Sequence, residues 1–327
     1  MSGSDVRVSV VVCTYNGEKY VRDQLQSILD QTRPPDEIII SDDGSADSTL
    51  EIVAEFTSST RGPHTPGWRV ETRITPLGVS GNFASALARA RGEFIALADQ
   101  DDVWEPDRLE KGLAHFHDGV LLVHSDATLI DASGRPTGTL MSALRLTGSE
   151  IRILLSGRAL DALLRRNVVT GATTMIRSSL LEHALPIPDG WVHDEWLALV
   201  AAAHGGVVFH QDPLIRYRQH GNNEIGASKT DYDEATRRLR EKRSEYFARK
   251  LRRNDGIAAL LENKPAWLGS VALSSLAAKV EFDQWRSTLP SSRVRRLFPV
   301  LRRWFTGHYG RYARGYLDVI RDIALTD

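Results

Sequence analysis

The stretch FIALADQDDVW, residues 94–104, passes from five apolar residues to three carboxylates that one glutamine interrupts. The apolar run has the length of a β-strand that is buried on both faces. Asp99, Asp101 and Asp102 follow directly after it. Because like charges at this spacing repel one another, the cluster either lies in open solvent or holds a cation or hydrogen-bond donors.

Further runs of strand length precede residue 94, and helical patterns separate them. The strand candidates are VRVSVVVC (6–13), DEIIIS (36–41), WRVETR (68–73) and EFIALA (93–98). Helices are expected at about 18–31, 47–57 and 81–91. This alternation predicts an α/β fold with a mainly parallel central sheet that helices cover on both faces.

Polar loops follow the carboxyl end of each predicted strand. They read TYNG (14–17), SDDGSAD (41–47), PLGVSGN (76–82) and DQDD (99–102). Ligands bind beyond the carboxyl ends of the strands in sheets of this kind. We therefore expect one crevice to collect side chains from all four loops, namely Asn16, Asp42, Asp43, Asn82, Asp99 and Asp101.

The alternation is less regular after residue 119. Strands are expected at 119–130, 168–176, 206–211 and 213–219, and helices at about 150–165 and at 193–204. From about residue 230 the pattern is helical, with breaks at Pro265 and Pro290. These patterns predict one α/β domain over residues 1–228 and a helical extension over residues 229–327.

Composition and charge limit the classes of protein to which this chain can belong. With 327 residues, of which 42% are hydrophobic and 25% charged, the chain is typical of a soluble globular protein. The single cysteine, Cys13, excludes an internal disulfide framework and a cysteine-based zinc site. No signal peptide or transmembrane segment is recognised, so a cytoplasmic location is expected. Residues 229–327 carry 21 Lys and Arg against 12 Asp and Glu, an asymmetry that indicates an anionic surface as partner.

The aspartates after the fourth strand suit a divalent metal ion. If extended geometry continues beyond Ala98, Asp99 and Asp101 project to the same side. Two such carboxylates suit Mg²⁺ or Mn²⁺, whose remaining ligands are water and a diphosphate. The same pattern also fits a solvated loop with helix-capping aspartates. The other loops must decide between these two interpretations.

Read together, the loops resemble the inverting glycosyltransferases of family 2, which have the nucleotide-sugar-binding GT-A fold. The resemblance is carried by VVVCTYNG, IIISDDGSADST, GNFASALARARGEFIALADQDDVW and WVHDEW, within about residues 6–223. The details DQDDVW, TGATTMIR, HDEW and YRQHGNN further resemble the bacterial rhamnosyltransferase-like branch, which builds surface polysaccharides from dTDP-rhamnose. The resemblance implies a nucleotide-binding part over residues 1–102 and an acceptor-side part over residues 103–228.

The resemblance also implies which residues contact the nucleotide sugar. Asp42 would accept the ring N–H of the pyrimidine, which favours uracil or thymine over cytosine, and Asp43 would support the loop or form a simple turn. Tyr15 would contact the base or pack against the protein, and Arg91 would help the nucleotide or only pair with a carboxylate. The full set is Thr14, Tyr15, Asn16, Asp42, Asp43, Asn82, Arg91, Asp99 and Arg218.

A metal site is implied at the fourth loop. Asp101 would be the direct ligand of Mg²⁺ or Mn²⁺, with Asp99 in the metal shell or on the ribose, and Asp102 would support the site. Arg218 and His220, in RYRQHGNN (216–223), would close over the diphosphate. His220 would contact the metal or phosphate, or only hold the loop.

The segment GWVHDEW implies the catalytic base. By resemblance, Asp194 takes the proton from an acceptor hydroxyl, which then displaces the nucleotide diphosphate with inversion; Glu195 as the base and a helix-capping role for Asp194 are the alternatives. The acceptor side is expected to include Thr173, Glu195 and Trp196. Trp196 would pack beneath the acceptor sugar or lie in the core.

The implied activity is transfer of a sugar, L-rhamnose from dTDP-rhamnose first, to a glycan or lipid-linked acceptor. A UDP-sugar donor is the alternative within the family. Outside it, D-x-D-x-V at 99–103 also resembles a haloacid-dehalogenase-like phosphatase, and a non-catalytic glycan-binding module would need no base. No base-reading motif indicates nucleic acid as a partner.

The C-terminal segment RVRRLFPVLRRWFTGHYGRYARGY (293–316) interleaves arginines with aromatic residues. Such a segment either lies peripherally on an anionic bilayer at the inner face of the cell membrane or packs its aromatic residues against the catalytic domain. Helices expected at 231–255 and 267–288 are candidates for contacts in a homo-oligomer.

Overall fold

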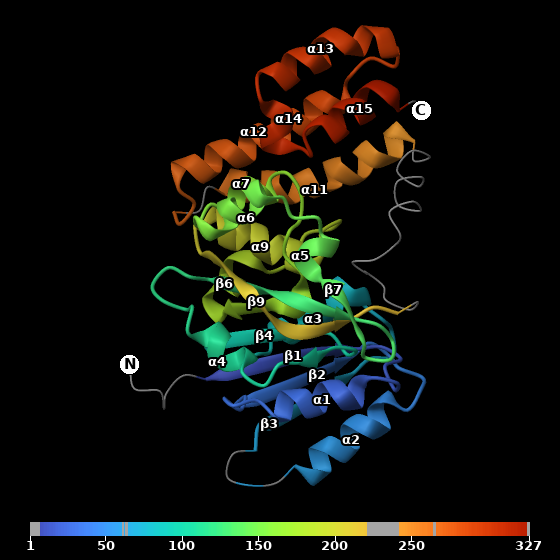
Figure 1. Ribbon diagram of the computed structural model, residues 1–327, viewed down its shortest axis with the longest axis vertical. Coiled ribbons are helices and arrows are strands. Elements are labelled where there is room, and N and C mark those ends of the chain that lie inside the picture. The colour runs from blue at the N-terminus through green and yellow to red at the C-terminus, as the bar shows by residue number, and fades with distance from the viewer. Residues whose placement is uncertain (1–6, 61, 63–64, 221–241, 264–265, 326–327) are drawn as a thin grey trace.

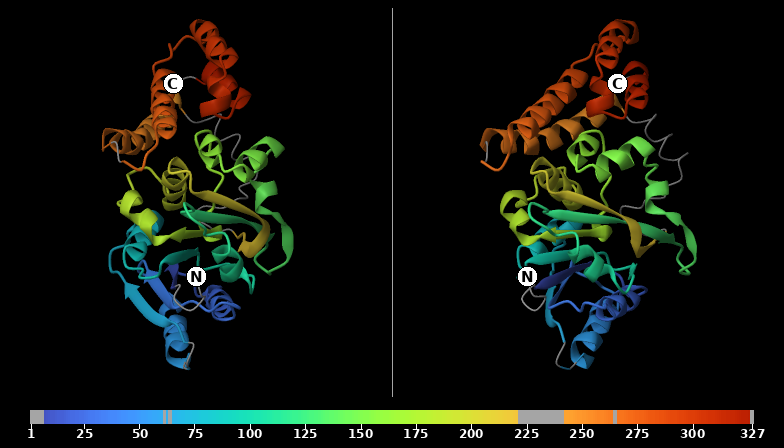
Figure 2. Two further views of the ribbon diagram at one scale, coloured as in Figure 1. Left: turned by 90° about the vertical axis from the view of Figure 1, so that its left-hand side faces the viewer. Right: turned by 60° about the vertical axis from the view of Figure 1, so that its left-hand side comes forward.

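The computed structural model describes residues 7–60, 62, 65–220, 242–263 and 266–325. A single curved sheet of nine strands forms the centre of the molecule, in the order β3-β2-β1-β4-β8-β6-β9-β5 with β7 paired to β6. Helices cover both faces of this sheet, and α11–α15 form a further layer stacked on one side of it (Figures 1 and 2). The predicted α/β class, with its central sheet and helical C-terminal region, is confirmed.

The first hundred residues fold in the predicted order of strands and helices, although the helix expected at about 81–91 begins at Gly78 and ends at Leu87. Their elements are β1 (Val8–Thr14), α1 (Val21–Leu29), β2 (Glu37–Asp42), α2 (Thr49–Ser59), β3 (Gly67–Thr72), α3 (Gly78–Leu87) and β4 (Phe94–Ala98). Strands β3, β2, β1 and β4 pair side by side and parallel, so their carboxyl ends share one edge. The register places Thr14 of β1 opposite Asp42 of β2 at that edge.

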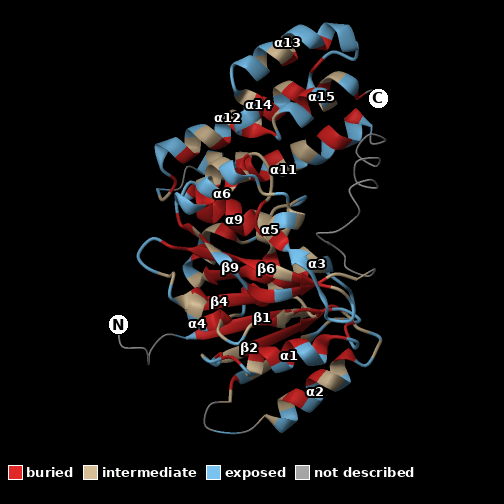
Figure 3. Cartoon of the chain, in the orientation of Figure 1, coloured by how far each residue is buried: buried red, intermediate tan, exposed pale blue. Residues whose placement is uncertain are grey.

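Both faces of the sheet are buried at β1, β2 and β4, which explains the nearly continuous apolar runs of these strands (Figure 3). In β1, Val8, Val10 and Val12 belong to the hydrophobic cluster that includes α1 and α2. Val11 belongs to the cluster on the other face, with α3 and α9. The alternation of side chains along a strand therefore supplies two cores from one run.

The second half of the sheet adds mixed strands and short helices. Its elements are β5 (Val103–Trp104), α4 (Arg108–Leu113), β6 (Leu122–Ile130), β7 (Pro136–Thr139), α5 (Leu140–Ala143), α6 (Gly148–Leu155), α7 (Ala159–Leu163), the 3-10 turn η1 (Gly171–Thr173), β8 (Thr174–Arg177), η2 (Ser178–Leu180), α8 (Leu181–Ala184), α9 (His193–Ala203) and β9 (Val207–Arg218).

Four predicted elements differ in this half. The expected strands at 206–211 and 213–219 are one strand, β9, because its pairing with β6 continues past a bulge near Asp212. The strand expected over 168–176 begins only at Thr174. The helix expected at about 150–165 is divided between α6 and α7 at Gly157, which has a φ of 74°.

The C-terminal helices are α11 (Arg243–Asn263), α12 (Ser270–Ser287), α13 (Arg293–Phe305), α14 (His308–Tyr312) and α15 (Tyr316–Ala324). Pro290 lies between α12 and α13, as predicted. The predicted break at Pro265, the start of the helix expected from 231, residues 221–223 of the RYRQHGNN segment and the proposed boundary at 228/229 lie outside the described residues. The division into domains at that boundary stays a prediction.

A buried polar cluster joins the last helices. Arg286 of α12 is fully buried and its guanidinium contacts Asp322 at 2.6 Å and Asp318 at 3.1 Å, both on α15. The Tyr309 hydroxyl donates to Asp322 at 2.6 Å. A buried cation of this kind is tolerated because carboxylates compensate it. Within the described parts of the chain, no helix combines the length and apolar character that a membrane crossing requires.

Candidate active site

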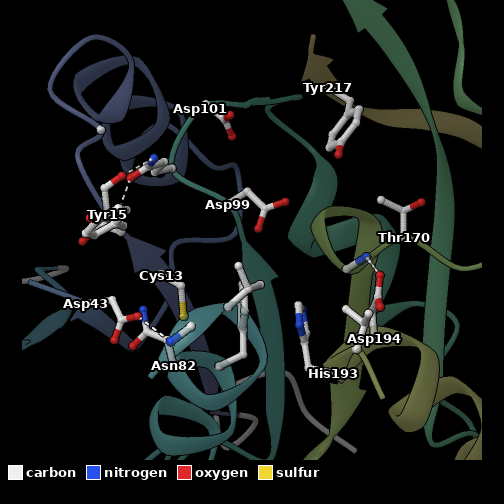
Figure 4. Close-up of a pocket in the computed structure, with 18 of the residues that line it drawn as sticks. Cys13, Tyr15, Asp43, Asn82, Asp99, Asp101, Thr170, His193, Asp194 and Tyr217 are labelled. Atoms are coloured by element: carbon white, nitrogen blue, oxygen red, sulfur yellow. Dashed lines mark hydrogen bonds between the residues drawn. The ribbon is translucent and has the colours of Figure 1, made fainter. Parts of the chain in front are cut away.

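A pocket of about 950 Å³ lies at the carboxyl edge of the parallel strands. Side chains from the loops after β1, β2 and β3 line one side, and Thr170, His193, Asp194 and Tyr217 line the opposite side (Figure 4). Asp99 and Asp101 lie between the two sides. The predicted site residues that line this pocket are Thr14, Tyr15, Asn16, Asp43, Asn82, Asp99, Asp101, Asp194 and His220.

The loop after β1 is held by its neighbours through its backbone. Asn16 has a φ of 49° in the left-handed region, and its Oδ1 accepts a hydrogen bond from the Ala46 N–H at 2.9 Å. The Gln100 amide accepts from the Tyr15 N–H at 2.8 Å and donates to the Tyr15 carbonyl at 3.0 Å. These hydrogen bonds fix the backbone of the loop, and the Tyr15 side chain is 48% exposed.

Asp42 and Asp43 have different surroundings from those expected. Asp42 is fully buried and accepts hydrogen bonds from the hydroxyls of Thr14 and Ser45 and from the N–H groups of Gly44 and Ser45. It does not line the pocket, so the pyrimidine contact expected of Asp42 does not fit its position. Asp43 lines the pocket and also accepts from the Leu77 and Gly78 N–H groups, each at 2.8 Å.

Asn82 reaches the pocket, but Arg91 does not. The Asn82 Oδ1 accepts from the Ser41 hydroxyl at 2.7 Å and from Arg73 Nη1 at 2.9 Å. Arg91 is exposed before the start of β4, at the edge opposite the pocket, where its backbone N–H donates to Glu37. The cation that holds Asn82 is therefore Arg73, for which the sequence predicted no role although it ends the run WRVETR.

Extended geometry does not continue past Ala98, because residues 99–102 form a turn. Asp99 and Asp101 nevertheless both line the pocket. Asp102 turns inward, where it is fully buried and its Oδ1 accepts from the Arg218 N–H at 2.9 Å. Arg218 also donates through Nε to the Asp101 carbonyl at 2.8 Å. Arg218 therefore stabilises the turn but does not line the pocket, although a contact with the diphosphate was expected of it.

His220 lies next to Asp101. Its Nε2 is 2.8 Å from Asp101 Oδ2, and its ring stacks on Tyr20 with 5.0 Å between ring centroids. In the described parts of the chain, no group of three or more His, Cys, Asp or Glu side chains is arranged to hold a metal ion. One carboxylate and one imidazole fit Mg²⁺ or Mn²⁺ when substrate phosphates and water supply the remaining ligands.

The carboxylates of the pocket repel one another. Burial, together with the charges of Asp101 and Asp194, raises the pKa of Asp99 to about 7. Burial also raises the pKa of Asp101, against the opposing effect of His220. The site is therefore short of positive charge near Asp99 and suits a ligand that brings a cation.

Asp194 lies at the start of α9, with its carboxylate fixed by two backbone donors. Oδ2 accepts from the Gly171 N–H at 2.8 Å and Oδ1 from the Glu195 N–H at 2.7 Å. Burial raises the pKa of Asp194 to about 6, which leaves the carboxylate ionised at neutral pH. A Cβ on Gly171 would lie 2.8 Å from His193 Nε2 and 3.4 Å from Asp194 Cβ, so glycine permits this close approach.

His193 and Tyr217 line the pocket, although no role was predicted for either residue from the sequence. The His193 ring stacks on Phe83 with 3.9 Å between centroids, and neither ring nitrogen has a hydrogen-bond partner within the described structure. Burial lowers the pKa of His193 to about 3, so the ring is neutral. Tyr217 ends the same strand as Arg218, and burial with the nearby aspartates raises its pKa well above the usual value. The sequence features that could have indicated these residues are the segment HDEW for His193 and the segment RYRQ for Tyr217.

The residues expected on the acceptor side do not line the pocket. Thr173 is buried and donates to the Thr170 carbonyl at 2.8 Å, while Thr170 itself lines the pocket. Glu195 forms an ion pair with Arg253 of α11 at 2.6 Å. Trp196 is buried and donates to the Ala184 carbonyl at 2.8 Å. Trp196 therefore lies in the hydrophobic core and not beneath an acceptor sugar.

Known proteins are similar to this chain in sequence and in structure. An uncharacterised protein of Mycobacterium tuberculosis is 30% identical over 233 residues, which are 68% of this chain and 62% of that protein, so the chain spans less than two thirds of this relative. The poly(ribitol-phosphate) β-N-acetylglucosaminyltransferase TarS of Staphylococcus aureus is 32% identical over 46% of this chain and 25% of its own length.

Solved structures show the same fold over nearly the whole chain. TarS residues 1–349 in complex with UDP-GlcNAc match with a TM-score of 0.58 at 19% identity, covering 98% of this chain and 90% of that one. The mannosyltransferase PcManGT of Pyrobaculum calidifontis, in complex with GDP-Man and Mn²⁺, matches with a TM-score of 0.53 at 16% identity, covering 97% and 85%. These structures agree with the GT-A fold that the resemblance implied.

A protein-family model matches the part of the chain that forms much of the pocket. The model described as glycosyl transferase family 2 matches residues 9–183, more than half of the chain. The matched range begins in β1 and includes both the DQDD turn and the Gly171 loop that holds Asp194. The chain therefore belongs to glycosyl transferase family 2.

Proposed function

We propose that the protein is an inverting glycosyltransferase that moves a sugar from a nucleoside diphosphate to an acceptor hydroxyl. The observation that carries the proposal is that Asp99 and Asp101 share one pocket with Asp194, which enters from the other side (Figure 4). One end of the pocket suits a diphosphate and the other offers an ionised base. The phosphatase alternative has no support once the chain belongs to family 2.

In the proposed mechanism Asp194 takes the proton of the acceptor hydroxyl. The hydroxyl oxygen then forms a bond to the anomeric carbon of the donor, while the bond from that carbon to the diphosphate breaks and the leaving group keeps the electron pair. Attack opposite to the leaving group inverts the anomeric configuration. The hydrogen bonds from Gly171 and Glu195 orient the Asp194 carboxylate for this step.

Asp101 and His220 would hold a divalent metal ion, with Asp99 nearby. When bound, the ion neutralises charge on the diphosphate leaving group. The Asp101–His220 contact and the raised pKa of Asp99 support this assignment. The Mn²⁺ in the complex of PcManGT is consistent with it. Arg218 acts indirectly, by fixing the turn that presents Asp101.

For the nucleotide, we assign the contact with the base ring N–H to Asp43 instead of Asp42. Asp43 lines the pocket, whereas the oxygens of Asp42 already accept four hydrogen bonds. A carboxylate acceptor favours uracil or thymine over cytosine. The donor proposed first is dTDP-rhamnose, with a UDP-sugar as the alternative that the complex of TarS with UDP-GlcNAc favours.

The proposed acceptor is a glycan or a lipid-linked saccharide of a surface polysaccharide, elongated at the inner face of the cell membrane. The poly(ribitol-phosphate) in the name of TarS supports a polymeric acceptor. A homo-oligomer stays a prediction, as does the helical contact expected to form it.

The test is a calorimetric titration with dTDP, UDP, CDP, GDP and ADP, each with Mn²⁺ or with chelator, followed by turnover of the matching sugar donors. Metal-dependent binding of dTDP or UDP, and its selective loss in Asp43→Asn, is expected. Asp42→Asn, the matched control, should lower the melting temperature instead, because it disturbs a buried set of hydrogen bonds. Tight binding of CDP with equal affinity, or no binding of any nucleotide, would contradict the proposal.

A further inference from the structure

Helix α13 turns its apolar face away from the protein. Val294 and Phe298 are each 76% exposed and Phe305 is 82% exposed. They share one stripe with Leu297 and Trp304, since the five recur at helical spacing. Surface helices of globular proteins normally bury such a stripe. Figure 3 shows that most of α13 is exposed, and in Figure 1 it lies at the end of the molecule farthest from α2.

The opposite face of α13 fixes this orientation. Arg296 is 1% exposed, and its guanidinium donates to the carbonyl of Asp322 at 3.0 Å and to that of Ser291 at 2.6 Å. Val300, one turn later, is fully buried. Rotating the helix to bury the apolar stripe would leave the Arg296 donors without partners, which is costly. The stripe is therefore held outward by the fold.

Arginines border the stripe on both sides. At 100° per residue, Arg295 and Arg302 lie along one edge of the stripe and Arg293 along the other, and all three side chains are exposed. Residues 293–316 contain seven arginines and no Asp or Glu. An apolar face with a cationic border is the arrangement of helices that lie in the interface of an anionic bilayer.

We propose that α13 binds the surface of an anionic lipid bilayer. Val294, Leu297, Phe298, Trp304 and Phe305 enter the boundary between headgroups and acyl chains, and Arg293, Arg295 and Arg302 contact lipid phosphates. The adjacent Trp304 and Phe305 rings, 5.4 Å apart between centroids, occupy the headgroup level that aromatic side chains favour. Tyr309 and Tyr312 take no part because both are buried.

Charge favours lipid over a second copy of the chain as the occupant. A twofold contact through this stripe would bring the arginines of two α13 helices together, and residues 293–316 contain no carboxylate to compensate them. Lipid phosphates supply the missing negative charge, and each arginine near such a surface strengthens binding by about fivefold.

The test is sedimentation of the full chain with vesicles of phosphatidylglycerol and phosphatidylcholine, or of phosphatidylcholine alone. Binding to the anionic vesicles is expected. Val294→Asp should weaken it by about tenfold, because the change removes one buried side chain and adds repulsion. Val271→Asp is the matched control, since Val271 is also 76% exposed and also second in its helix, α12, and should leave binding unchanged.

Further variants separate charge from apolar contact. Arg295→Glu and Arg302→Glu should each weaken binding by about fivefold or more, and Phe298→Ser tests the stripe without adding charge. The proposal is overturned if the unaltered protein ignores anionic vesicles, or if Val294→Asp and Val271→Asp bind equally. A concentration-dependent dimer that Val294→Asp abolishes, without vesicle binding, would assign the stripe to a second copy. Because vesicle binding is read without turnover, its failure would leave the proposed transferase unaffected.

Discussion

The imidazole of His220 lies 2.8 Å from the carboxylate of Asp101, although 119 residues separate them in the chain. Arg218, two residues before His220, donates to the Asp101 carbonyl and so aligns the two segments. The carboxylate and the imidazole thus meet at the rim of the same pocket. The pair offers one oxygen and one nitrogen ligand where a diphosphate would bind.

Replacing Asp101 by Asn should weaken Mn²⁺-dependent binding of UDP or dTDP by at least about tenfold, since it removes the charged ligand. His220→Ala should weaken it less, because imidazole is the poorer partner for a hard cation. Titration calorimetry with and without chelator measures both. Asp212→Asn, which alters an exposed side chain, is the control. Metal-dependent affinity that Asp101→Asn leaves intact would remove Asp101 from the metal site.

Asp194→Asn should retain nucleotide binding and lower kcat by about a hundred- to ten-thousandfold, the usual contribution of a general base. The amide keeps the shape of the side chain but cannot take the proton. Steady-state kinetics with a matched donor and acceptor provide the measurement. The control is Glu195→Gln, the next residue, which breaks the pair with Arg253 outside the pocket. We expect a loss of less than about tenfold for that control.

The pH dependence of turnover should report the raised pKa of Asp194. The carboxylate acts as base only when ionised, so kcat/KM should fall as the pH drops through about 6 and level off above it. An unperturbed aspartate would instead keep activity down to the ordinary value of 3.8. A profile of kcat/KM, with a melting scan at each pH to exclude unfolding, distinguishes the two. A midpoint near the ordinary value would contradict the assignment.

Gly171→Ala should lower kcat strongly with little effect on nucleotide affinity. The added Cβ would lie 2.8 Å from His193 Nε2 and displace the loop that donates to Asp194. We expect a loss of stability of ~1–3 kcal/mol from the overpacking. Gly148→Ala is the matched control, since a Cβ there meets no atom within 4 Å. Unfolding curves and kinetics of both variants test the effect, and equal behaviour of the two would argue against it.

Much of the α/β part was predictable because strand and loop chemistry are local in the sequence. The apolar runs that form β1, β2 and β4 can be recognised without knowing which strands pair. Parallel pairing then brings the carboxyl ends of those strands together. Asn16, Asn82 and Asp99, which follow the carboxyl ends of β1, β3 and β4, line the pocket for this reason. Arg91 does not line it, because Arg91 lies just before β4 and the amino end of a parallel strand lies at the edge opposite the carboxyl ends.

Neighbouring residues with the same chemistry could not be separated from sequence. Asp42 and Asp43 are both carboxylates after one strand, yet hydrogen bonds from the Thr14 and Ser45 hydroxyls hold Asp42 inside while Asp43 lines the pocket. Asp194 and Glu195 are separated by 100° on α9, and only the packing of α11, with Arg253, decides that Glu195 faces away.

The sequence by itself determined the order of strands and helices over the first hundred residues, the cluster of carboxylates after β4 and membership of a glycosyltransferase family, since these depend on local periodicity and on motifs. Only the tertiary structure decided which carboxylate enters the pocket, that Arg218 supports the DQDD turn from behind, and that α13 exposes its apolar stripe. The physical reason is that burial and hydrogen-bond satisfaction depend on residues far apart in the chain, as Arg296 and Asp322 are.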